Sequence, residues 1–475
     1  MSGSLNGISN TAASGLAAIQ ASIGVVSDNV ANAGVAGYTA KTQDLSVFEV
    51  GTQSFGVRIG QISRSVDTAV QASAWSSAAS VSALTVQSQT LQAINATQGT
   101  PGAGTSLADA VSGLQAGFTQ LQAQPSSPVQ QSAVVTAAGT LANAINNTAN
   151  TITSERNDVQ AQIVTTIDSL NSALSIVEST TKSLMSAVAS NSSTAALADQ
   201  RDAALQTLSG TLSLHYNEQA DGNITILGQN GLSIPMDSRF STAGAVLSPT
   251  STYAAGTASI PPILLQSSNP AIPPVDVTGQ LSGGQLGQLV HLRDTTLPAY
   301  TASLDTFSAN LATQFSSQGL QLFTGGGGAT IASSSTGLSS QIQVNPAVTT
   351  TPSLVRDGTP AGAANAAGVA GFTGIINAVL NSTFAGAGTT PSLATQAQSF
   401  VSRQSADTAQ AGTDLTNATA YQTTITGALS GGSGVNVDQQ MGLMIQLQNS
   451  YQANAQVMTA TRTMFTALLN IFAQS

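Results

Sequence analysis

The chain has 475 residues, no cysteine and a formal net charge of -10, and only 7% of its residues are charged. Without cysteine there is no disulfide framework and no thiolate metal site, and eleven Lys plus Arg residues are too few for a surface that binds nucleic acid. The first ten residues lack the charged and apolar regions of a secretory signal peptide, and no apolar run is long enough to predict a membrane span.

Residues 5–30 are predicted to form a helix, because their apolar residues recur in steps of three and four, the pattern of a coiled-coil seam. Together with Ala12, the stripe consists of Leu5, Ile8, Leu16, Ile19, Ile23, Val26 and Val30. Three glycines lie in the same segment, and each weakens a helix by about 1 kcal/mol relative to alanine. We therefore expect this helix to form only when its stripe is covered.

The first helix is predicted to end in the stretch "ANAGVAGY". Asn32, Gly34 and Gly37 can adopt the positive φ that ends a helix, and Tyr38 follows them. We interpret these four residues as an elbow that redirects the chain.

The middle of the chain alternates between helical and strand-like patterns. Helices are expected over about 76–97 and 105–122, over 134–188 as one long element or two in tandem, and over 195–210. The pairs Asp221-Gly222 and Asn230-Gly231 then separate short apolar runs, which predicts a small antiparallel meander. A helix returns near residue 285 and another near residue 392, with Gly-, Ser- and Thr-rich segments before each.

A long C-terminal helix is predicted after the flexible stretch "SGGSGVN". It covers about 37 residues, or roughly 55 Å, and has almost no charge. Its apolar stripe is formed by Met441, Met444, Leu447, Tyr451, Met458, Phe465, Leu468 and Phe472. A stripe this long is sticky when exposed, so we expect the two terminal helices to pack on each other and on copies of themselves.

These patterns predict a mainly α fold with inserted β structure. The expected terminal coiled-coil domain comprises residues 1–35 and 436–475. A helical rod domain is assigned to 36–212, 285–318 and 392–435, and one or two β-rich outer domains to 213–284 and 319–391. The expected shape is a rod with the terminal helices at one end and a β domain at the other.

No combination of residues indicates catalysis, a cofactor or a metal. His215 and His291 have no second histidine at ligand spacing, and the Ser179-x-x-Lys182 pattern lacks the motifs that accompany it in serine acyltransferases. The remaining charged cluster is Asp199, Arg201 and Asp202, which we interpret as capping or inter-helix ion-pair residues. The chain is therefore predicted not to be an enzyme.

Four stretches of the sequence together resemble a known family. "SDNVANAGVAGYT" is similar to the N-terminal signature of bacterial flagellar axial proteins, with Gly34-Val35-Ala36 in place of the usual Asn-Thr-Pro. "LADQRDAALQTLS" with the Asp221-Gly222 turn, the segment 284–312, and the C-terminal stretch from "SGVNVDQQ" onward resemble successive parts of the flagellar hook-associated protein 1 family.

The resemblance implies a structural adaptor that joins the flagellar hook to the filament, in which both terminal helices form the core of a tubular oligomer. It implies contacts with copies of itself, with the hook protein and with a second junction protein, hook-associated protein 3. It also implies an export chaperone on the C-terminal helix, and an extracellular location reached through the flagellar type III apparatus. Alternatives are another axial protein of the hook or flagellin type, a secreted helix-rich adhesin or effector, and a cytosolic coiled-coil scaffold.

Overall fold

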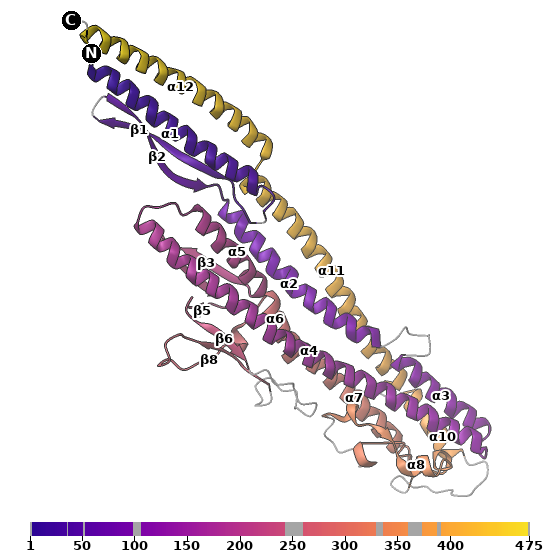
Figure 1. Ribbon diagram of the computed structural model, residues 1–475. Coiled ribbons are helices and arrows are strands. Elements are labelled where there is room, and N and C mark those ends of the chain that lie inside the picture. The colour runs from indigo at the N-terminus through magenta and orange to yellow at the C-terminus, as the bar shows by residue number, and fades with distance from the viewer. Residues whose placement is uncertain are drawn as a thin grey trace.

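The computed structural model describes residues 2–35, 37–50, 53–97, 106–242, 260–328, 336–359, 373–386 and 391–473. The molecule is elongated, and the two ends of the chain lie together at one end of it (Figure 1). There α1 (Ser2–Asn32) packs beside α12 (Val437–Ala473). The predicted helices at both ends of the sequence are therefore confirmed, and so is their pairing within the chain.

A two-stranded β-hairpin covers a second side of α1. It consists of β1 (Lys41–Val50) and β2 (Gln53–Arg64), which pair antiparallel and contact α1. The assignment of these residues to a helical rod was wrong, because their apolar residues follow the period of a strand. We call α1, α12 and this hairpin the terminal body.

Long helices form the rest of the rod. α2 (Thr68–Thr97) runs beside α11 (Leu393–Ser433), and α3 (Leu107–Ala123) packs against α4 (Pro128–Ala189). The stretch that was predicted as one helix or two is the single 62-residue α4. It begins where the Ser127 side chain accepts a hydrogen bond from the Gln130 backbone N–H and Pro128 occupies the first turn, as helix starts favour.

Three further helices pack along α4. They are α5 (Ala195–Thr211), α6 (Gly284–His291) and α7 (Leu297–Ser316). A π-helical turn, Leu292–Thr296, joins α6 to α7. The helix expected near residue 285 is thus present, and a π-helical turn interrupts its α-helical geometry.

Two small antiparallel sheets follow α5, with strand orders β3-β4-β5 and β6-β7-β8. The strands are β3 (Leu214–Glu218), β4 (Ile224–Gly228), β5 (Ser233–Ile234), β6 (Arg239–Thr242), β7 (Ile263–Gln266) and β8 (Val275–Asp276). Gly222 and Gly231 adopt φ of 85° and 79° in the turns of the first sheet, which confirms the predicted meander.

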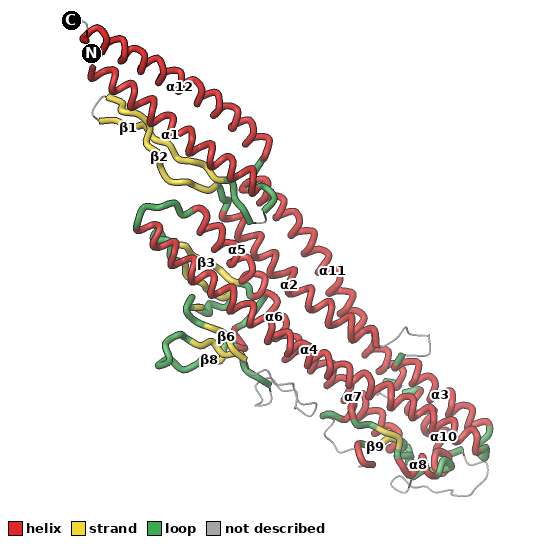
Figure 2. Tube along the Cα trace, viewed as in Figure 1, coloured by secondary structure: helices red, strands yellow, loops and turns green. Residues whose placement is uncertain are grey.

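The segment 319–391 differs from expectation in its described part. It holds one short pair, β9 (Phe323–Thr324) with β10 (Gln343–Val344), and several short helices. These are α8 (Pro346–Thr350), α9 (Leu354–Asp357), α10 (Gly374–Ala378) and a π-helix, Val379–Phe384. The β structure lies along the side of the rod, and mostly helices occupy the end opposite the termini (Figure 2).

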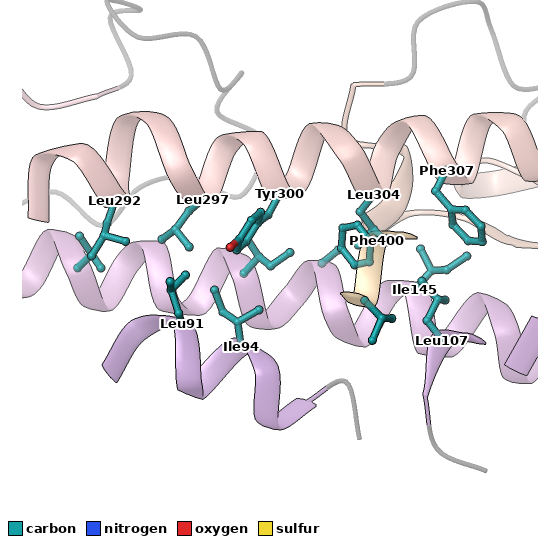
Figure 3. Packing of buried hydrophobic residues seen from close by; sticks show 14 of the residues in the cluster. Leu91, Ile94, Leu107, Ile145, Leu292, Leu297, Tyr300, Leu304, Phe307 and Phe400 are labelled. Atoms are coloured by element: carbon teal, nitrogen blue, oxygen red, sulfur yellow. The ribbon is translucent and has the colours of Figure 1, made fainter. Parts of the chain in front are cut away.

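A continuous apolar core runs along α4 and holds the central helices together. Figure 3 shows Leu292, Leu297 and Leu304 on one side of it, and these side chains are fully buried. Nearer the far end, Phe118 and Phe315 pack with ring centroids 5.7 Å apart. The central helices therefore complete their core within one chain.

Candidate assembly interface

The seam between α1 and α12 is antiparallel and has one consistent register. Gly15 faces Asn454, whose Nδ2 lies 3.4 Å from where a Cβ on Gly15 would stand. Gln20 donates a hydrogen bond to the Tyr451 hydroxyl over 3.5 Å, and Asn29 donates to Gln440 over 3.1 Å. From one pair to the next, the residue number rises along α1 and falls along α12, as it must when two helices run antiparallel.

The predicted stripes lie mostly in this seam, but few of their side chains are fully covered. Val26 is buried. The half-buried members are Leu16, Ile19, Ile23, Val30, Met444, Leu447, Tyr451, Met458 and Phe465. Ile8 and Met441 remain 47% and 48% exposed, so they lie outside the seam. The side chains of Leu5, Leu468 and Phe472 are outside the described part of the structure.

A second apolar surface on α12 was missed by the sequence reasoning. Leu443, Val457 and Met464 are exposed on the side of the helix next to the seam. They occupy positions seven residues or a multiple of seven apart, so they follow one line along the helix. This spacing was visible in the sequence, although only the seam stripe was recognised.

The hairpin adds an exposed apolar face on another side of α1. Gly56 approaches α1 so closely that a Cβ there would lie 2.0 Å from Ser14 Oγ, and the Val57 N–H donates to that hydroxyl over 3.1 Å. Side chains alternate along a strand, so Val57 points away from α1, as does Val47 opposite it. Leu45 and Ile59 pair on the same outward face, and Leu45, Val47 and Ile59 are all exposed.

The elbow connects α1 to the hairpin. α1 ends at Asn32, and Gly37, with φ of 79°, is the one of the three predicted turn residues that adopts a positive φ. The Tyr38 hydroxyl donates to Asn29 Oδ1 over 3.0 Å, and Lys41 Nζ lies 4.1 Å from the centroid of the Tyr38 ring. Burial, with the Asp28 and Asp199 carboxylates nearby, raises the pKa of Tyr38, so the phenol stays protonated and able to donate.

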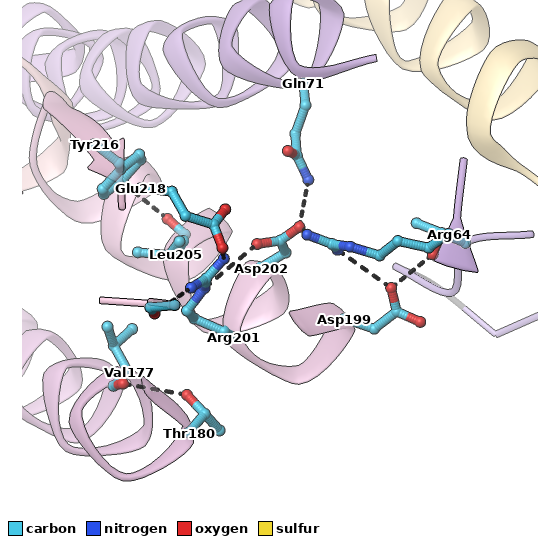
Figure 4. Close-up of polar contacts among 12 residues, drawn as sticks. Arg64, Gln71, Val177, Thr180, Asp199, Arg201, Asp202, Leu205, Tyr216 and Glu218 are labelled. Atoms are coloured by element: carbon cyan, nitrogen blue, oxygen red, sulfur yellow. Dashed lines mark hydrogen bonds and ion pairs between the residues drawn. The ribbon is translucent and has the colours of Figure 1, made fainter. Parts of the chain in front are cut away.

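A cluster of charged residues joins the terminal body to α5 (Figure 4). Asp199 lies 3.1 Å from Lys41 Nζ and 3.4 Å from Arg64 Nη1, and Asp202 lies 2.6 Å from Arg64 Nη1. The Thr39 hydroxyl also donates to Asp199 over 2.6 Å. Removing one member of such a largely buried set would leave a charge uncompensated. We call these five residues the joint.

Arg201 reaches Asp202 only over 4.0 Å, from its Nε to the carboxylate, and its closer contacts are with other residues. Its Nη2 lies 2.7 Å from Glu218 on β3, and its Nη1 donates to the Gly222 carbonyl over 3.2 Å. The interpretation that grouped Arg201 with Asp199 and Asp202 therefore placed the right residues in ion pairs but missed their main partners. Lys41 and Arg64 lie far away in the sequence, and no local pattern identifies them.

Within the described residues, no group of three His, Asp or Glu side chains is placed to hold a metal ion. None of the described helices combines the length and the apolar character needed to cross a bilayer. What the described residues do offer is a set of surfaces for contact.

Comparison with known proteins identifies two related families. The model of the flagellar hook-associated protein FlgK helical domain matches residues 91–330, about half of the chain. The model of the C-terminal region of flagellar basal body rod FlgEFG proteins matches residues 426–471, which include most of α12. No curated protein matches the sequence.

Among solved structures, the flagellar hook junction protein FlgK from Burkholderia pseudomallei is similar, with 22% sequence identity and a TM-score of 0.46. The match covers 54% of this chain and 47% of that one, so it spans about half the length of the solved protein.

Proposed function

The chain belongs to the family of the flagellar hook-associated protein FlgK, and on that premise we propose that it is a structural subunit joining the flagellar hook to the filament. The observation that carries the proposal is the incomplete cover of α12. Of its described side chains, only Thr461 is buried, although the helix has 37 residues and an apolar stripe along its length.

The terminal body leaves enough apolar surface to support assembly. Val437, Ile445 and the line formed by Leu443, Val457 and Met464 are all at least 40% exposed. Burying a fully exposed large apolar side chain contributes about 1.5–3 kcal/mol. A side chain that is already half-buried therefore gains about half of that when a partner covers the rest. Several such contacts together would favour the docking of copies whose helix pair is already formed.

Copies of the chain would meet through different faces. The hairpin and α12 contact different sides of α1, and each presents apolar side chains outward. A contact of one kind of face with another is heterologous, and it closes into a ring or continues as a helix. This geometry suits a tubular oligomer with the hook protein on one side and the second junction protein, hook-associated protein 3, on the other.

Before assembly the same surface of α12 needs a cover. An export chaperone that takes an amphipathic helix into an apolar groove would supply it, and the methionines of α12 allow one surface to fit more than one partner. Release at the growing tip, after passage through the flagellar type III apparatus, would then expose the stripe to neighbouring subunits.

A deletion strain tests the proposal. Cells without the chain should build hooks but no filaments and should release monomeric flagellin into the medium, and the full-length chain supplied in trans should restore filaments. A strain lacking residues 437–473 alone should behave like the deletion although the shortened protein is present. Normal swimming in the deletion strain would refute the proposed function.

A further inference from the structure

Asn29 is a buried polar residue at the point where three elements of the terminal body meet. It is 0% exposed and lies near the end of α1. Its Nδ2 donates to the Lys41 carbonyl over 2.8 Å and to Gln440 Oε1 over 3.1 Å. Its Oδ1 accepts from the Lys41 N–H over 3.0 Å and from the Tyr38 hydroxyl over 3.0 Å.

These four contacts use the full hydrogen-bonding capacity of an amide side chain. They also fix its orientation, because the Lys41 backbone presents one donor and one acceptor that are not interchangeable. Nδ2 must therefore face the Lys41 carbonyl and is left to donate to α12. Gln440 is the residue that receives this bond.

The rest of the seam specifies only weakly how far α12 is displaced along α1. Apart from the 3.5 Å hydrogen bond from Gln20 to the Tyr451 hydroxyl, its contacts come mostly from apolar and small residues, among them Ala12, Gly15 and Ala18. A shift by seven residues, about 10 Å, would again place apolar residues opposite apolar residues. It would, however, place Leu447 or Ser433 opposite Asn29, and neither side chain reproduces the contact with Gln440.

The covalent connection to α12 can lengthen enough for the shift that brings Ser433 opposite Asn29. The last turn of α11 and the following link contain Gly431, Gly432 and Gly434, which are poor helix residues. Converting a helical residue to extended chain lengthens it from about 1.5 Å to about 3.3 Å. Six residues can therefore supply about 10 Å.

We propose that Asn29 is a positioning residue that sets the register between α1 and α12. A buried asparagine fixes register in a coiled coil in the same way, because every other register leaves it unsatisfied. The bond to Gln440 couples this choice to the closed elbow through Tyr38 and Lys41. The consequence for assembly rests on the proposed function, since the register decides which faces of α1, α12 and the hairpin neighbouring copies meet.

The absence of cysteine from the chain makes disulfide trapping a clean test. The purified full-length chain carries Gly15→Cys together with Asn454→Cys to report the observed register. Gly15→Cys with Thr461→Cys and Gly15→Cys with Leu447→Cys report shifts of seven residues in either direction. Intramolecular cross-links are quantified after mild oxidation, which also traps a pair that forms only transiently.

We expect the observed-register cross-link to dominate in the parent chain. Asn29→Leu and Gln440→Leu should each raise the ratio of shifted to observed cross-links about tenfold, the factor that corresponds to about 1.4 kcal/mol. Asn32→Leu is the matched control, because among the described residues the Asn32 side chain bonds only to the Asp28 carbonyl of its own helix. It should leave the ratio unchanged.

Gln440→Leu is the decisive variant. It removes the hydrogen bond between Asn29 and Gln440 by changing the half-buried Gln440, and it leaves the bonds of Asn29 to the elbow intact. A raised shifted yield in this variant supports the proposal even if Asn29→Leu fails to fold. An unchanged ratio, or loss of the observed cross-link without a shifted product, overturns it, because the residue then contributes only to stability. The readout uses purified protein, so it stands apart from whether the chain joins hook to filament.

Discussion

α4 and α12 differ in where their apolar stripes find partners. α4 buries a stripe that runs from Gln131 to Leu184 against helices of the same chain. α12 lies against α1 alone among the helices it packs on extensively, and Thr461 is its one buried residue in the described part. Both helices show steps of three and four in the sequence, so the same pattern serves an internal core in one case and an open seam in the other.

The comparison indicates that stripe residues alone do not decide whether a helix is part of a finished core. What differs is the number of neighbouring elements. α4 contacts several helices and two sheets, whereas α12 has one extensive partner in the described part and keeps Leu443, Val457 and Met464 exposed. Four experiments test whether α4 and α12 differ in this way.

Hydrogen exchange on dilute monomer should separate the two regions most clearly. Amides of 5–30 and 440–472 should exchange with little protection, because a helix pair with half-covered stripes is marginal in water and opens often even though its closed form keeps one register. Amides in the middle of α4 should exchange at least about a thousand times more slowly, as expected for a core that opens only on global unfolding. Strong protection of both terminal segments would contradict the distinction.

Leu447→Asp with Phe465→Asp should abolish incorporation at the hook tip and weaken binding of an export chaperone. Both side chains lie half-buried in the seam. Packing an apolar neighbour against a carboxylate at these positions would bury an unpaired charge, which is unfavourable. The matched control is Gln448→Asp with Thr466→Asp, which adds the same charge to exposed positions and should assemble.

A thermal melt of the double variant separates loss of assembly from misfolding. It should match the melt of a truncation ending at Ser433, and both should keep the cooperative transition of the central helices. If neither shows that transition, the seam is an integral part of the folding core.

Alanine substitutions compare how much a leucine in α4 and a leucine in α12 contribute to the free energy of unfolding. Leu141→Ala in α4 removes a fully buried side chain and should lower the free energy of unfolding by about 2–5 kcal/mol. Leu447→Ala removes the same atoms from the seam and should cost less than about 1 kcal/mol in the monomer. Urea denaturation followed by circular dichroism measures both, and equal losses would place α12 in the core.

The joint should show a smaller and more local effect. Asp199→Ala removes the carboxylate that faces Lys41 and Arg64, so the base of the hairpin should open more often. Trypsin cleavage after these two residues should then accelerate about tenfold, the equivalent of about 1.4 kcal/mol. Glu178→Ala breaks ion pairs outside the joint, those with Lys182 and Arg239, and cleavage at the joint should not change. Acceleration in both variants would mean that the effect is not local.

The sequence was most informative where one element specifies its own shape. The steps along α4, the Asp221-Gly222 turn and the stripe of α12 were all predicted from neighbouring residues. The hairpin was missed because its strands mix apolar residues with Asp44, Glu49 and Arg58. Its apolar face also points to solvent, and the position closest to α1 is Gly56, so the usual pattern of a buried apolar face is absent. Strand signals of this kind are weak without a partner in view.

Contacts between distant residues were beyond the same reasoning. Asp199 and Asp202 were recognised as ion-pair residues, but Arg64 is 135 residues from Asp199. Met441 was placed in the seam because it fits a step of three, yet the register set around Gln440 leaves it outside. Asn32 and Gly34 were expected to be able to adopt positive φ, but of the three predicted turn residues only Gly37 does so.

The pairing of α1 with α12 also has a consequence in time. Asn29 and Gln440 are 411 residues apart, and ribosomes add about 5–20 residues per second, so α1 emerges roughly 20–80 s before its partner exists. A stable amphipathic helix would expose its stripe throughout that interval. The glycines at positions 7, 15 and 24 lower the helix propensity of α1, so the segment can wait as an open chain and become helical when α12 arrives.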